Sequence, residues 1–203
     1  MRPAKRSSAL PYFATMLIQN RGVASSLRID ELAVPGVAGR LGLLACPGAA
    51  WAQPDRPDFA CTLAADLDAV VAWGARTLVT LMEWREFARA GVEDLPRMAE
   101  RRLQWVWLPV PDGKAPDERF AAAWPGAGHL LRARLAVGER IAVHCLGGLG
   151  RTGTLAAQLL IEHGLDARLA MATVRAARPG SIETRAQVNY LLGLDPSQGH
   201  AER

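Results

Sequence analysis

Residues 141–164, IAVHCLGGLGRTGTLAAQLLIEHG, contain the pattern that decides the fold. The short apolar run IAVH at 141–144 is typical of a buried strand, and it leads directly into a glycine-rich turn. The alanines and leucines that follow favour a helix, and Gly164 is a natural end for it. A strand, a tight turn and a helix in immediate succession indicate one unit of an α/β fold.

The same alternation extends to both sides of this segment. Further strands are expected at 41–46, 77–82 and 105–110, and two more helices are expected at about 166–177 and 184–192. Alternating strands and helices are typical of a parallel sheet covered by helices. The sequence therefore predicts an α/β fold: a single three-layer domain with a central, mostly parallel sheet of four to five strands flanked by helices.

Helices are also expected between the strands. Thr62 is expected to cap one helix, and residues 84–91 are expected to form another, short one. A third helix, capped by Asp117, should kink or break at Pro125-Gly126 before it resumes over 129–137, because proline lacks the backbone donor and clashes with the preceding turn.

The composition suits one globular domain. The chain has 203 residues, half of them apolar, and single domains commonly run to one or two hundred residues. We expect the domain to span residues 26–195, after a flexible extension at 1–25 and before a tail at 196–203. The apolar stretches are interrupted before the roughly 18 residues that cross a bilayer, so we expect no membrane partner.

The charge and the cysteines exclude further classes of function. The net charge of +4 comes from arginines spread along the chain, without the basic tract and interleaved aromatic residues of a nucleic-acid groove. Cys46, Cys61 and Cys145 show no paired spacing and no metal-binding pattern with histidine. The unpaired cysteines favour a reducing compartment, so we expect a cytoplasmic protein in which Cys46 and Cys61 are core residues. We also expect a monomer without metal or cofactor.

Four side chains capable of chemistry follow the ends of the four predicted strands. Cys46, Glu83, Asp112 and Cys145 each lie at or just beyond such an end. Open α/β sheets bind ligands at this edge. Glu83 could also serve only to end its strand, and Asp112 beside Gly113 is equally typical of an ordinary turn.

The turn after 141–144 has the composition of a phosphate-binding loop, whose residues would be Leu146, Gly147, Gly148, Leu149, Gly150 and Arg151. Its glycines allow positive φ angles, which turn backbone N–H groups inward to form a nest for phosphate oxygens. The following helix adds the positive end of its dipole. The sequence therefore predicts an anion site at the start of this helix.

The residues that flank this loop predict a nucleophile and its support. The same donors should stabilise a thiolate at Cys145, which is then a ready nucleophile. Arg151 offers a planar fork for two phosphate oxygens. Thr152 can donate its hydroxyl to the sulfur, whereas His144 is expected to fix the loop through hydrogen bonds.

The segment 144–152 meets in full the signature H-C-x5-R-[ST] of the protein tyrosine phosphatase superfamily. The sequence also resembles the dual-specificity branch that contains the cyclin-dependent-kinase-associated phosphatases, through LGLLACPG at 41–48, LPVPDGKAPD at 108–117 and RPGSIETRAQVNYL at 178–191. The resemblance implies a cysteine-dependent phosphatase that hydrolyses phosphotyrosine, and phosphoserine or phosphothreonine, in proteins or peptides through a phosphocysteine intermediate.

The resemblance also implies roles for residues outside the loop. Asp112 would protonate the leaving group and then activate the water that cleaves the intermediate, with Asp117 as the second candidate. Gln187 would orient that water, and Ile182 and Thr184 would shape the loop. Two other functions stay open from the residues alone: a phosphate-binding module without turnover, and a thiol enzyme such as a sulfurtransferase or an arsenate reductase.

Overall fold

The computed structural model of the chain describes residues 27–49 and 59–194. In these residues five strands form one mixed sheet in the order β1-β2-β5-β3-β4. The strands are β1 (Asp30–Ala33), β2 (Arg40–Leu44), β3 (Ala75–Thr80), β4 (Gln104–Trp107) and β5 (Arg140–His144). β1 runs antiparallel to β2, and the other neighbours are parallel. The central position of β5 places the end of this strand between two neighbours.

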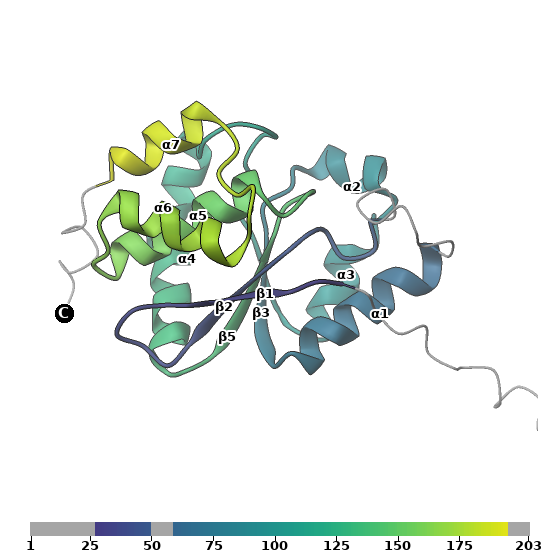
Figure 1. Cartoon of the computed structure of the whole chain (residues 1–203). Helices are drawn as coiled ribbons and strands as arrows, with labels where there is room; N and C mark the ends of the chain where they lie inside the picture. Colours follow the sequence, from purple (N-terminus) through teal and green to yellow (C-terminus); the bar gives the residue numbers. More distant parts are fainter. Residues whose placement is uncertain (1–26, 50–58, 195–203) are drawn as a thin grey trace, which may run out of the picture.

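Helices cover both faces of the sheet. They are α1 (Phe59–Ala72), α2 (Trp84–Ala90), α3 (Leu95–Glu100), α4 (Glu118–Ala136), α5 (Gly150–Glu162), α6 (Ala167–Ala177) and α7 (Arg185–Leu192). Figure 1 shows α1 and α3 on one side of the sheet and the group α4 to α7 on the other. Among the described helices, none is both long enough and apolar enough to cross a membrane.

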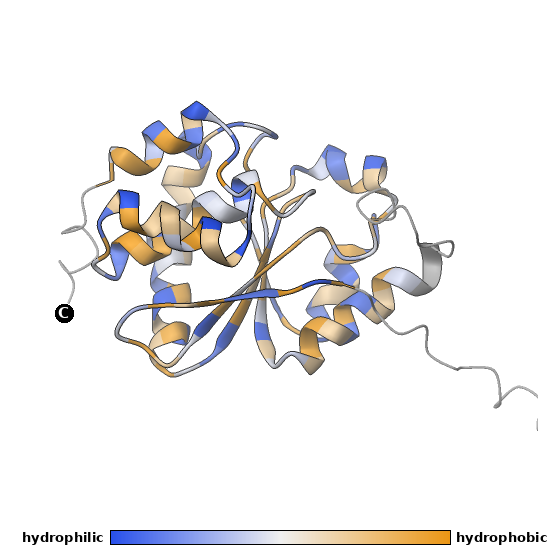
Figure 2. Ribbon diagram, in the orientation of Figure 1, coloured by the Kyte–Doolittle hydropathy of each residue, from blue (hydrophilic) through white to orange (hydrophobic). Residues whose placement is uncertain are grey.

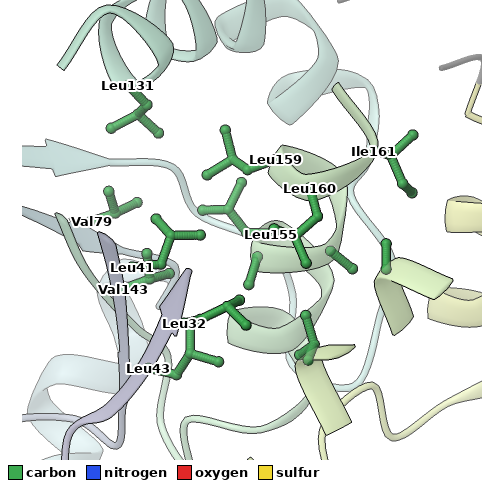
Figure 3. Close-up of a cluster of buried hydrophobic side chains, with 14 of the residues drawn as sticks. Leu32, Leu41, Leu43, Val79, Leu131, Val143, Leu155, Leu159, Leu160 and Ile161 are labelled. Carbon is green, nitrogen blue, oxygen red and sulfur yellow. The ribbon is translucent and has the colours of Figure 1, made fainter. Parts of the chain in front are cut away.

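Two clusters of buried side chains fill the space between the layers. Alternation along the strands separates them, because Val79 and Val143 join the cluster under α4 and α5, whereas Leu78 and Ala142 join the cluster under α1 to α3. Figure 3 shows strand side chains such as Leu41 pointing toward α5. In Figure 2 hydrophobic and hydrophilic residues alternate along the helices, as expected where one helix face packs on the sheet.

The predicted three-layer α/β architecture and its mostly parallel sheet are confirmed. All four predicted strands are present, but β3 and β4 end at Thr80 and Trp107, two or three residues before the predicted ends. The apolar residues after them are buried and lead into the loops of the site. β1 and α3 were not predicted, since four and six residues give too little periodicity to recognise.

Two helix predictions need correction. The predicted break at Pro125-Gly126 does not occur, because α4 runs from Glu118 to Ala136 with Pro125 inside it, and the alternative, a kink there, stays a prediction. Pro125 and Gly126 are exposed, so water can replace the hydrogen bond that proline removes. α1 begins at Phe59, so the buried Thr62 lies in its first turn and is not its cap. The predicted extension 1–25 and the tail 196–203 lie outside the described residues.

Truncating a core side chain of the central sheet should lower the stability of the whole domain. Leu41 of β2 is fully buried, so Leu41→Ala should reduce the free energy of unfolding by about 3 kcal/mol. Val137→Ala truncates a side chain that is 76% exposed and should change the free energy of unfolding by less than about 0.5 kcal/mol. Urea denaturation measures both, and equal effects would contradict the described packing.

Candidate active site

Cys145 follows the central strand β5 directly, at the sheet edge where the sequence predicts the site. Its side chain is buried, with 3% of the residue exposed. The backbone N–H of Gly148 donates a hydrogen bond to Cys145 Sγ over 3.2 Å. A donor aimed at the sulfur favours its negative charge, so the predicted support of a thiolate has a structural basis.

The glycines of the loop have different roles, and only one of the three uses the positive φ angle that glycine allows. Gly148 alone does so, with a φ of 71°, and a side chain at this position would collide with the Leu44 carbonyl. Gly147 has open space around its Cα atom. Gly150 is packed against the side chains of Glu183 and Gln187, so a larger residue there would have to displace these two side chains.

Arg178 holds the loop from behind. Its Nε donates to the Gly148 carbonyl over 2.6 Å and its Nη2 to the Gly147 carbonyl over 3.3 Å. In a trans peptide the N–H and C=O groups point in opposite directions. Holding the Gly147 carbonyl toward Arg178 therefore turns the Gly148 N–H toward Cys145, as its hydrogen bond to Sγ requires.

The guanidinium of Arg178 is itself fixed by a carboxylate from β1. Its Nη1 lies 2.7 Å from Asp30 Oδ2, and both side chains are nearly buried, at 12% and 11% exposed. Sequence reasoning missed Asp30 and Arg178, because the two residues are 148 positions apart. The antiparallel strand β1 thus has a role in positioning the site.

Arg151 lies at the start of α5 with its side chain buried, at 1% exposed. It forms an end-on pair with Glu86, since Nη1 donates to Oε2 over 2.7 Å and Nη2 to Oε1 over 2.8 Å. Burial alone would lower the pKa of Arg151, but the hydrogen bond to Glu86 and the negative charges of Cys145, Glu86 and Asp112 raise it above its ordinary value. Arg151 therefore stays charged.

Glu86 was also missed by sequence reasoning, which considered Glu83 at the end of the preceding strand instead. It is the third residue of α2, and its Oε2 accepts a hydrogen bond from the Glu83 backbone N–H in a capping box. The spacing Glu83-x-x-Glu86 before an apolar residue is the signal that could have identified this helix start. One carboxylate thus caps α2 and holds Arg151.

Asp112 reaches the site from the loop after β4. Its Oδ1 accepts a hydrogen bond from Arg151 Nη2 over 2.7 Å, although 72% of its side chain is exposed. Asp117, the second candidate acid, instead caps α4 by accepting from the backbone of Arg119 and Phe120. The side-chain hydrogen bond from Arg119 lowers the pKa of Asp117, which disfavours it as a proton donor.

His144 is fully buried in a chain of hydrogen bonds. Its Nδ1 lies 3.0 Å from the Cys145 carbonyl, which can only accept, so Nδ1 carries the proton. Its Nε2 therefore accepts from Thr80 Oγ1 over 2.7 Å, and Trp105 Nε1 donates to the same Oγ1 over 2.9 Å. Burial is the main cause that lowers the pKa of His144 to about 4, so the ring is neutral and anchors the loop as expected.

Gln187 and Thr152 adjoin the loop. Gln187 is buried; its Oε1 accepts from the Glu183 and Thr184 backbone, and its Nε2 donates to the Lys114 carbonyl over 3.2 Å. It therefore connects α7 with the loop that carries Asp112. The Thr152 hydroxyl is buried and has no hydrogen-bond partner within residues 27–49 and 59–194, so its predicted hydrogen bond to sulfur stays a prediction.

The turn before α7 supports the loop from below. Ile182 has a φ of 61°, an uncommon angle for a β-branched residue. Arg175 donates to the carbonyls of Ser181 and Ile182, both over 3.1 Å, and the Ile182 N–H points to the Leu149 carbonyl at 3.4 Å. These contacts agree with the predicted role of Ile182 in shaping the loop.

Cys46 is buried in the core, as predicted, at the end of β2. Burial raises the pKa of its thiol well above the ordinary value, and the nearby charges of Cys145, Glu86 and Asp66 add to this effect against the opposing charge of Arg151. A neutral thiol is a poor nucleophile. The Cys61 side chain lies outside the described residues.

No group of three or more His, Cys, Asp or Glu side chains suited to a metal ion occurs in the described part.

Comparisons with known proteins agree with this arrangement. A family model described as "Swiss Army Knife protein, DSP-PTPase phosphatase domain" matches residues 60–191. Human protein tyrosine phosphatase type IVA 3 is 30% identical over 139 residues, which are 68% of this chain and 74% of that protein. Tyrosine-protein phosphatase CDC14 of Candida albicans is 33% identical over 90 residues, which are 44% of this chain but only 16% of that protein.

Solved structures share the fold. Kinase associated phosphatase aligns with a TM-score of 0.72 and 24% identity, covering 81% of this chain and 92% of that chain. Tk-PTP in its active form aligns with a TM-score of 0.56 and 25% identity, covering 80% and 95%.

Removing the Arg178 side chain should weaken the anion site. In Arg178→Ala the Gly147 and Gly148 carbonyls lose charge-assisted hydrogen bonds, so the loop should bind phosphate less tightly. The inhibition constant of inorganic phosphate in aryl phosphate hydrolysis should rise by about tenfold or more. Asp30→Asn keeps the shape but removes the charge that fixes Arg178, and should have a smaller effect in the same direction. Arg168→Ala, on the exposed start of α6, is the control, and unchanged phosphate inhibition in Arg178→Ala would contradict the positioning role.

The buried His144 should make stability depend on pH. Because its pKa falls from 6.5 to about 4 on folding, the unfolded chain binds more protons than the folded one between these values, and stability falls as the pH decreases through this window. The loss should be about 2 kcal/mol between pH 7 and pH 5. Denaturation of His144→Asn at both pH values should lack this loss of stability. The variant His129→Asn, which changes an exposed histidine, should retain it. An equal pH dependence in all three proteins would refute the assignment.

Proposed function

Because the chain belongs to the dual-specificity branch of the cysteine-dependent protein tyrosine phosphatases, we propose that it hydrolyses phosphotyrosine and phosphoserine or phosphothreonine in proteins, with Cys145 as nucleophile. The observation that carries this proposal is the hydrogen bond from Gly148 N–H to Cys145 Sγ beside the buried Arg151. In this proposal the sulfur is the nucleophile and the guanidinium binds the phosphate. The proposed substrates are phosphorylated proteins or peptides.

Arg151 is arranged to receive a phosphate on one edge of its guanidinium. The end-on pair with Glu86 uses one N–H of Nη1 and one of Nη2, and the remaining Nη2 N–H, on the side of Nε, is given to Asp112. Nε donates to no atom of the described residues. A phosphate that takes the Nε and Nη2 donors together would therefore displace Asp112 from Arg151.

The displaced Asp112 is our candidate for the general acid. Its exposed side chain sits on the loop 108–117, at the mouth of the site. In the first step Cys145 Sγ attacks phosphorus, the bond to the leaving oxygen breaks, and Asp112 gives that oxygen a proton. In the second step Asp112 takes a proton from water, whose oxygen attacks phosphorus and releases Cys145 as thiolate.

Gln187 and Thr152 have supporting roles in this proposal. The Gln187 amide packs against Gly150 and donates to Lys114 in the acid loop, which supports a place for the attacking water between loop and acid. Thr152 would donate its buried hydroxyl to sulfur as the thiolate is released. We also propose a cytoplasmic location and a monomeric state. The free thiols of Cys46 and Cys145 support a reducing compartment.

Hydrolysis of an aryl phosphate in the presence of chelator tests the proposal. Cys145→Ser should abolish turnover, and Asp112→Asn should slow it by about 10²- to 10⁴-fold, the usual contribution of a general acid. Asp117→Asn is the matched control, since its side chain caps α4, and it should retain most of the activity.

Other outcomes would identify another function. If the wild type binds phosphopeptide without turnover, the chain is a binding module. If it turns over thiosulfate or arsenate in place of aryl phosphate, it is a thiol enzyme of another class. Activity in Cys145→Ser would show that the site is misassigned.

A further inference from the structure

Aromatic side chains form an exposed surface beside the site. The ring of Trp84 packs edge-on against Phe87 at 5.5 Å and against Trp107 at 6.1 Å, and Trp107 stacks on Trp105 at 6.2 Å. Trp84 is 63% exposed and Trp107 is 41% exposed. Exposed apolar residues scattered singly need no explanation, but these two are in contact with each other. We call Trp84 and Trp107 the aromatic surface.

This surface borders the residues that hold the phosphate. Trp84 is the first residue of α2, whose third residue, Glu86, pairs with Arg151. Trp107 is the last residue of β4, before the loop that carries Asp112, and its Nε1 donates to the Met82 carbonyl over 2.8 Å. A phosphorylated residue bound at Arg151 would therefore place its chain neighbours close to these rings.

The rings are held in place before any partner binds. The capping box of Glu83 and Glu86 fixes the first turn of α2, and the hydrogen bond of Trp107 fixes its indole. A rigid tryptophan loses little conformational entropy on binding, which is one reason that tryptophan is enriched among residues that dominate binding energy. The aromatic surface is therefore suited to bind an apolar side chain.

The helix that begins with Trp84 also carries two exposed arginines. Arg85 and Arg89 lie one turn apart on α2 and are both exposed, and neither has an ion-pair partner in the described residues. The acidic neighbour Glu83 forms an ion pair with Arg119, with 3.4 Å between Oε1 and Nη2. A partner that meets this face should therefore carry negative charge as well as an apolar group.

We propose that the aromatic surface, together with Arg85 and Arg89, binds the segment that flanks the phosphorylated residue of a protein substrate, and that this segment has an apolar side chain among acidic residues. The inference rests on the proposed function, because it places the phosphate at Arg151. It adds a substrate preference that the phosphate loop alone does not supply.

The test compares two phosphopeptides that share one phosphotyrosine. One has leucine and glutamate beside it, and the other has glycine and lysine. Wild type should prefer the first in kcat/KM. Trp84→Ala should lower kcat/KM for the first peptide by about tenfold, and Arg85→Ala with Arg89→Ala should remove the dependence of this preference on salt. Leu169→Ala, which truncates a side chain 57% exposed on α6, is the control and should change nothing.

Turnover of a small aryl phosphate separates this proposal from the proposed function. It should be unchanged in Trp84→Ala, because the aryl group does not extend to the surface. An equal loss on aryl phosphate and on peptide would overturn the proposal by showing that Trp84 acts through α2 and Glu86. Unchanged peptide kinetics, or a preference of wild type for the basic peptide, would overturn it as well.

Binding measurements keep the test decisive if the wild type has no activity. Fluorescence anisotropy in the Cys145→Ser background gives the affinity for both peptides without turnover. If the peptide with leucine and glutamate binds more tightly than the other, and if Trp84→Ala weakens its affinity about tenfold, the role of the aromatic surface is supported even where the proposed function fails. Equal affinities for both peptides overturn it.

Discussion

The ion pair between Arg151 and Glu86 is the interaction on which the rest of the site depends. A buried guanidinium without a partner would cost several kcal/mol, and the two hydrogen bonds to Glu86 offset that cost while fixing the plane of the fork. Because Glu86 also caps α2, the orientation of Arg151 is tied to that helix and to the sheet beneath it. The pair joins α2 and α5, which follow different strands.

Several elements could be predicted from the sequence because their signals are local. The run from Ile141 to Gly164 specifies a strand, a loop and a helix through apolar pattern and glycine alone. The place of Cys145 at the end of the central strand follows from the same run. Asp112 could be selected because it lies just beyond another predicted strand, and its hydrogen bond to Arg151 now sets it apart from Asp117.

The parts that could not be predicted depend on contacts between distant positions. Glu86 becomes important only when the side chain of Arg151 reaches it from the start of α5, and Arg178 only when β1 brings Asp30 to it. Pro125 lies inside α4 because the exposed side of a helix tolerates a missing hydrogen bond, which sequence periodicity does not reveal. Which loop glycine takes a positive φ angle could not be predicted either, since the sequence does not show that Gly148 is the one that packs against the Leu44 carbonyl.

The central claim is that the sulfur of Cys145 receives the phosphoryl group. Rapid quenching of the reaction in acid, followed by peptide mapping with mass spectrometry, tests this claim most directly. In Gln187→Ala, where cleavage of the intermediate should be slowed, the account predicts one phosphoryl group on the peptide that contains Cys145. A phosphoryl group on another residue, or steady turnover without any phosphorylated peptide, would contradict it.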